Sequence, residues 1–66
     1  MRIWINGAAH DLGGTPVVAD ALSAAGLPEQ GVAVAVDGEV VPRAGWADVP
    51  LADGAKLEVL TAVQGG

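Results

Sequence analysis

The sequence has 66 residues, of which 52% are hydrophobic, and its formal net charge is −5. Its length is that of one small domain, and it has no cysteine, which excludes a disulfide framework and a thiolate metal site. Its three basic residues are scattered, which argues against nucleic acid or an anionic membrane as a partner, since both need clustered Lys and Arg.

Two features of the sequence predict a cytoplasmic protein without a membrane partner. The longest wholly apolar run, residues 32–36, is far shorter than the roughly 20 residues that cross a bilayer. Met1-Arg2 leads directly into a predicted strand, without the regions that make up a signal peptide.

The N-terminal part of the chain predicts a β-hairpin. Residues 2–5 alternate between the two faces of a strand. Asn6-Gly7 follows, and it is the strongest two-residue hairpin signal because both central positions of a type I′ turn need positive φ. The second strand is expected over Ala8–Leu12, and Gly13-Gly14 ends it. This Gly-Gly lacks the spacing and the Lys of a phosphate-binding loop.

A helix of about ten residues is expected next. Thr15 or a neighbour would cap it, and Pro16 suits its first position. Gly26 is expected just after its end. Apolar residues recur at the helical spacing and predict one stripe packed against a sheet: Val18, Ala21, Leu22 and Ala25.

The second half of the chain predicts three more strands. They are a central strand at Val32–Val36, a short strand at Glu39–Pro42 after an Asp37-Gly38 turn, and a final strand from Lys56 to Val63. Residues 43–48 are expected to form an irregular or 3₁₀ turn that packs Trp46 over one end of the core.

This order of elements predicts an α+β fold in two layers, with one helix packed across one face of a mixed sheet of four to five strands. The first and last strands are expected side by side in the middle of the sheet. The other face of the sheet is then left open.

The open face predicts a docking surface. If Leu57 and Val59 point toward the helix, then Trp4, Leu60 and Ala62 point outward. A contiguous exposed apolar patch with a Trp favours binding of a partner protein. The alternative is that Trp4 only shields the sheet.

The sequence shows no constellation typical of an enzyme. His10 is the only histidine, and no serine or carboxylate pair has the spacing of a triad or metal site around it. His10 is expected on the surface of a strand. We therefore predict no catalytic residue, no metal and no bound cofactor, and interpret the chain as a substrate or carrier of other enzymes.

The last three residues are Gln64, Gly65 and Gly66. We expect a domain over 1–63 and a flexible tail over 64–66. The two glycines add no side chain, so a narrow channel in another protein could admit the tail, and its carboxylate could attack a phosphorus centre. Gly-Gly alone does not separate this interpretation from an ordinary Gly-rich terminus.

Longer segments of the sequence support the carrier interpretation in addition to the two terminal glycines. Val41-Pro42-Arg43-Ala44-Gly45-Trp46, the run 51–60, the ending Ala62-Val63-Gln64-Gly65-Gly66 and the early Asn6-Gly7 together resemble the thiamin-biosynthesis sulfur-carrier proteins, the ThiS family. The resemblance covers essentially the whole chain and implies the β-grasp, ubiquitin-like fold. One departure is Thr15-Pro16-Val17, which lacks the Thr-x-x-Glu helix start common in relatives.

The resemblance also implies a mechanism. A ubiquitin-activating-like adenylyltransferase would use ATP to join AMP to the carboxylate of Gly66. A cysteine desulfurase-derived sulfur donor would then displace AMP and leave a thiocarboxylate, whose sulfur thiazole synthase would take for the thiazole of thiamin. Gly65 would be the small residue that admits the terminus.

Three alternatives remain open. The chain could carry sulfur for molybdopterin or for a natural-product pathway, because such carriers share the fold and the Gly-Gly. It could be a ubiquitin-like modifier joined to lysines through Gly66. It could also be a plain binding module with an inert tail.

Overall fold

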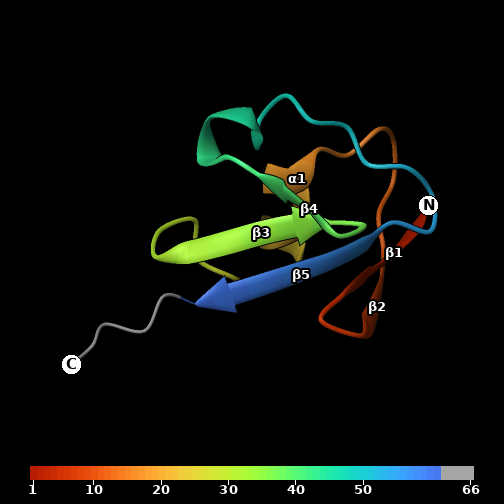
Figure 1. Ribbon diagram of the computed structural model, residues 1–66. Coiled ribbons are helices and arrows are strands. Elements are labelled where there is room, and N and C mark those ends of the chain that lie inside the picture. Colours follow the sequence, from red (N-terminus) through yellow and green to blue (C-terminus); the bar gives the residue numbers. More distant parts are fainter. Residues whose placement is uncertain (62–66) are drawn as a thin grey trace.

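The computed structural model describes residues 1–61 (Figure 1). Within these residues, a β-hairpin, an α-helix, a second β-hairpin, a 3₁₀ helix and a final strand follow one another. The elements are β1 (Arg2–Ile5), β2 (Ala8–Asp11), α1 (Val18–Ala24), β3 (Val32–Val36), β4 (Glu39–Val41), a 3₁₀ helix η1 (Arg43–Gly45) and β5 (Lys56–Thr61).

The five strands of residues 1–61 form one mixed sheet in the order β2-β1-β5-β3-β4. β5 pairs in parallel with β1 and antiparallel with β3, and both hairpins are antiparallel. The expected mixed sheet with one helix is confirmed, as is the contact between the first and last strands. The central strand, however, is β5 and not Val32–Val36, because the last strand inserts between the two hairpins.

The core lies between the sheet and α1, which covers one face (Figure 1). Both layers contribute aliphatic side chains, as the alternation and the helical spacing predicted. The fully or nearly fully buried members are Ile3, Ile5, Leu57, Val59 and Val34 from the sheet and Val18, Ala21 and Leu22 from the helix. Burial of this apolar area is the main favourable term in folding.

The helix is shorter than expected, because it begins at Val18 rather than at Pro16. Residues 16–17 are used instead in a long-range contact: Val17 forms a β-bridge with Pro50, and the Pro16 carbonyl accepts a hydrogen bond from the amide of Leu51 at 2.9 Å. The first amide of α1, that of Val18, donates to the carbonyl of Val49 at 3.2 Å. The loop before β5 thus pairs with backbone groups of residues 16–18, and residues 16 and 17 do not form another helical turn.

The start of α1 also differs in its cap. Val17 precedes the helix and has no side-chain oxygen, so neither Thr15 nor any hydroxyl caps it. The carboxylate of Asp20 accepts a 2.9 Å hydrogen bond from the backbone N–H of Val17. Asp20 lies in the first turn, where a negative charge is favourable beside the positive end of the helix dipole.

The end of the helix agrees with the prediction. Gly26 has a φ of 68°, which suits glycine after a helix. The amide of Gly26 donates a 3.1 Å hydrogen bond to the carbonyl of Ser23, and the amide of Leu27 donates a 2.9 Å hydrogen bond to the carbonyl of Leu22. This paired arrangement satisfies two terminal carbonyls and turns the chain away from the helix.

The predicted 3₁₀ turn is confirmed. It occupies Arg43–Gly45, directly after Pro42, and Trp46 follows with only 4% of its surface exposed. No helix among residues 1–61 is long and apolar enough to cross a membrane.

Candidate functional site

The candidate site is the face of the sheet opposite α1. The side chains of β5 alternate: Leu57 and Val59 are buried toward the helix, whereas Lys56, Glu58 and Leu60 are exposed on the other face. Leu60 retains 66% of its accessible surface. The inward and outward assignment made from the sequence is therefore confirmed for the part of β5 that the structure describes.

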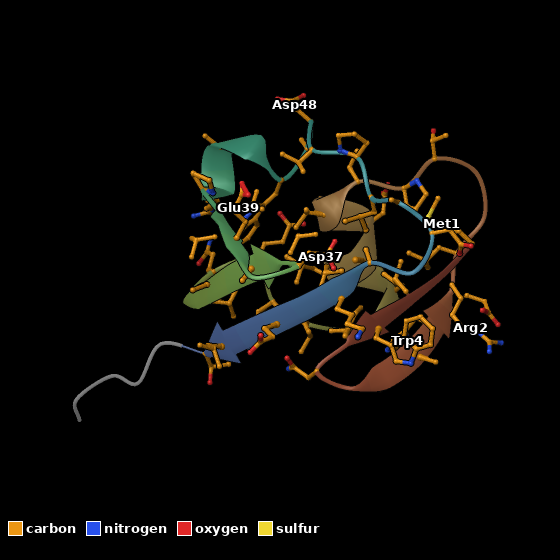
Figure 2. The ribbon with its side chains drawn as sticks, turned by 45° about the vertical axis from the view of Figure 1, so that its right-hand side comes forward. Met1, Arg2, Trp4, Asp37, Glu39 and Asp48 are labelled. Atoms are coloured by element: carbon orange, nitrogen blue, oxygen red, sulfur yellow. The ribbon has the colours of Figure 1, made fainter. Side chains whose placement is uncertain are left out.

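Trp4 and Leu60 share this face but do not touch. Trp4 is half-buried and lies opposite Lys56 in the β1–β5 register, near the start of β5 (Figure 2). Leu60 lies four residues farther along the strand, about 13 Å away at the usual rise of a strand. Because Lys56 and Glu58 lie between them, the expected contiguous patch is divided.

Leu60 instead belongs to an apolar group on β3, β4 and β5. Ala33 lies directly opposite Leu60, and Ala35 lies opposite both Glu58 and Val40. Val40 is 73% exposed, the most exposed large apolar side chain of the described part. We call Leu60, Ala33, Ala35 and Val40 the apolar strip. Val40 was missed from the sequence, although counting back from the Asp37-Gly38 turn would have placed it opposite Ala35.

The tail residues of the prediction lie outside the described residues. These are Ala62, Gln64, Gly65 and Gly66. The last described residue, Thr61, pairs with Val32 at the end of β5. The apolar strip therefore adjoins the point at which the described chain stops.

One ion pair lies at the edge of the same face. Arg2 and Asp11 are opposite each other in the β1–β2 register, and the guanidinium Nε is 2.9 Å from a carboxylate oxygen. The hydrogen bond from Arg2, and then its positive charge, lower the pKa of the Asp11 carboxyl. Both side chains are well exposed, so the pair joins the two strands of the hairpin at the surface and is not placed for acid–base chemistry.

The only histidine lies on the helix-facing side of the sheet. His10 is in β2 opposite Ile3 and is half-buried, so it is on a strand as expected but is less exposed than a surface residue. Within residues 1–61, no three His, Cys, Asp or Glu side chains lie close enough together to hold a metal ion.

In the described part of the chain, the sheet order, the one α-helix across one face and the uncovered opposite face define the class of protein: an α+β protein with the β-grasp, ubiquitin-like fold. The sequence model of the ThiS family matches residues 3–66. The chain therefore belongs to the ThiS family.

Solved structures agree with this assignment. The chain is similar to the crystal structure of a thiamine biosynthesis protein (ThiS) from Geobacter metallireducens, with 29% identity, a TM-score of 0.81 and full coverage of both chains. It is also similar to a solution structure of a thiamine biosynthesis protein from the same organism, with 29% identity, a TM-score of 0.75 and coverage of 100% of this chain and 88% of the other. No curated protein sequence matches the chain.

Proposed function

We propose that the protein is a sulfur carrier for thiamin biosynthesis and that the sulfur is carried on the carboxylate of Gly66. One observation supports this most directly: the match to the ThiS family extends to residue 66 and so includes Gln64, Gly65 and Gly66. The chain has no cysteine. A sulfur atom transferred through this protein must therefore be held by a group other than a thiol.

The chemistry requires activation by another protein. A carboxylate is a poor electrophile, so its oxygen first attacks the α-phosphorus of ATP, which releases pyrophosphate and leaves an acyl-adenylate. Sulfur from a donor charged by a cysteine desulfurase then attacks the acyl carbon, and AMP leaves. This attack by the donor's persulfide sulfur gives an acyl disulfide, and a second thiol then cleaves its S–S bond, which leaves the donor thiol in a disulfide with that thiol and releases the thiocarboxylate. The thiocarboxylate is a strong nucleophile and can deliver sulfur to thiazole synthase.

The protein's own part in this proposal is to be recognised and to present its terminus. Trp4, Leu60 and Ala62 remain our candidates for contact with the adenylyltransferase, and the apolar strip adds Val40. Because glycine has no side chain, two terminal glycines can enter an active site through a narrower channel than any other pair of residues. We place these reactions in the cytoplasm, as expected from the sequence.

Intact mass after reaction with the activating enzyme, ATP and a sulfur donor tests the proposal. We expect the mass to increase by the difference between one sulfur and one oxygen atom, and the increase to be absent when Gly66 is deleted. Addition of thiazole synthase and its co-substrates should then return the mass to its starting value.

Other outcomes would contradict the proposal. Adducts linked to lysines would identify a ubiquitin-like modifier. Sulfur loading without return of the mass in the presence of thiazole synthase would indicate a carrier for molybdopterin or another product. If the Gly66 deletion is as active as the wild type in every assay, the tail is inert.

A further inference from the structure

The side chain of Asn6 takes the place of one more residue of β1 along the central strand. Alternate residues of β5 direct their backbone groups toward β1, and the amide of Asn6 donates to the carbonyl of Leu57 at 2.9 Å. Two residues farther along β5, the Asn6 side chain makes both bonds to Val59. Its Nδ2 donates to the Val59 carbonyl at 3.0 Å, and its Oδ1 accepts from the Val59 amide at 2.9 Å.

This geometry explains why the residue is asparagine. Asn6 has a φ of 50°, a left-handed conformation that Asn adopts more readily than most residues. Its backbone thus turns into the hairpin and leaves β5, while its side chain, an amide like the peptide group, continues the pairing. Glycine would suit the turn but would offer Val59 nothing, and aspartate could accept a hydrogen bond but could not donate one.

Val59 is consequently the last position of β5 at which the described structure places a partner on each edge of the strand, with the Asn6 side chain bonded on one edge and Val34 opposite it in the register on the other. Its side chain is 6% exposed within the core, and it lies opposite Val34 on the β3 side. Among the described residues, Thr61 is paired only with Val32 of β3. From Val59 to Gly66 is seven positions (66 − 59), a reach of at most about 25 Å in an extended chain.

We propose that Asn6 is a positioning residue for the reactive terminus, because it fixes the point on the central strand from which Gly66 must reach a partner's active site. This inference rests on the proposed function. Without the Asn6 side chain, the β1 side of β5 is bound only as far as Leu57. The terminus then samples more positions, and its effective concentration at an active site falls.

The second hairpin provides a matched control. Asp37 also has a φ of 50° and is followed by Gly38, and its Oδ1 accepts a 3.1 Å hydrogen bond from the amide of Lys56. Asp37 therefore contacts the beginning of β5 in the way that Asn6 contacts the part nearer its end. Asn6→Gly and Asp37→Gly each remove a side chain that hydrogen-bonds to β5. Each introduces glycine, which suits positive φ.

The experiment compares these two variants with the wild type, at a temperature where circular dichroism shows all three folded. For Asn6→Gly we expect amide exchange at Val59 to accelerate about tenfold. We also expect kcat/KM for adenylation to fall about three- to tenfold, mainly through KM. Asp37→Gly should leave kcat/KM within about twofold of the wild type, even where it lowers stability equally. Asn6→Asp keeps one of the two bonds and should lie between, and it serves as the test if Asn6→Gly does not fold.

Two results would overturn the inference. One is an equal effect of Asn6→Gly and Asp37→Gly on kcat/KM, which would make the role of Asn6 purely structural. The other is an unchanged exchange rate at Val59. These results differ from failure of the proposed function, in which the wild type itself accepts neither AMP nor sulfur.

Discussion

The indole Nε1 of Trp46 donates a 2.9 Å hydrogen bond to the backbone carbonyl of Val41. The two residues flank Pro42 and the 3₁₀ turn, so this bond closes the loop that follows the edge strand β4. The indole is itself buried in the core. One side chain therefore fixes both the end of the sheet and the start of the loop that leads to β5.

Replacing Trp46 by Phe should test this double role. The change removes the donor of the hydrogen bond to the half-buried Val41 carbonyl, so we expect a loss of about 1–3 kcal/mol in the free energy of unfolding. Urea unfolding followed by circular dichroism measures it. Trp4→Phe, in a half-buried position on the open face, is the control and should change stability by less than about 1 kcal/mol. Equal effects of the two changes would contradict the role assigned to the hydrogen bond.

Truncation of the core should be severe in so small a domain. Leu22 is fully buried, with 0% exposure, and Leu→Ala at such a site costs about 2–5 kcal/mol. Total stability at this length is about 3–10 kcal/mol. We therefore expect Leu22→Ala to be largely unfolded or close to it, as measured by thermal unfolding. The exposed neighbour Ser23→Ala should remain near the wild type.

The Arg2–Asp11 pair predicts a pH dependence of defined sign. The folded protein lowers the pKa of Asp11 below its ordinary value of about 3.9. The contribution to stability is thus present above that value and is lost as the pH falls through the folded pKa. We expect Asp11→Asn to be slightly less stable than the wild type at pH 7, and the two to converge in acid and in high salt. Glu29→Gln, at an exposed position after α1, is the control, and a difference that grows in acid would contradict the sign.

The two parts of the open face should be separable by mutation. Leu60→Asp and Val40→Asp change exposed side chains of the apolar strip, whereas Trp4→Ala changes the other end of the face. We expect binding to the adenylyltransferase to weaken about tenfold or more for each variant whose mutated residue lies in the interface with that enzyme. A titration with the purified enzyme measures this weakening, and thermal unfolding should show a nearly intact fold.

The control for that titration is Ala24→Asp, which adds the same charge at an exposed position on the helix. If it weakens binding as much as Leu60→Asp does, then added charge and not the apolar strip is responsible. If none of the sheet variants has an effect, the partner binds elsewhere.

Much of the fold could be predicted because its determinants are local. The Asn6-Gly7 turn follows from its own residues, and so does Gly26 at the end of the helix. The start of α1 could not be predicted in this way, because the residues before it pair with the segment around Pro50, more than thirty positions away in the sequence.

The candidate site was predicted only in part for a similar reason. Alternation along β5 reveals which side chains share a face, and this assignment was correct for Leu60. It does not reveal the register between strands that are distant in sequence, which places Trp4 opposite Lys56. The separation of Trp4 from Leu60 is therefore a property of the fold and not of either strand alone.

The contact between Asn6 and Val59 has a chemical consequence as well. Asparagine followed by glycine is prone to lose its amide, because the glycine nitrogen can attack Cγ and expel ammonia, and asparagine counts among the thermolabile residues. While the sheet is intact, both polar atoms of this amide are engaged with the central strand, which restrains the rotation that the attack needs. Water then opens the succinimide that this attack forms, so a molecule that has spent long unfolded would carry an aspartate or isoaspartate carboxylate at position 6. After refolding, that carboxylate could no longer donate a hydrogen bond to the Val59 carbonyl.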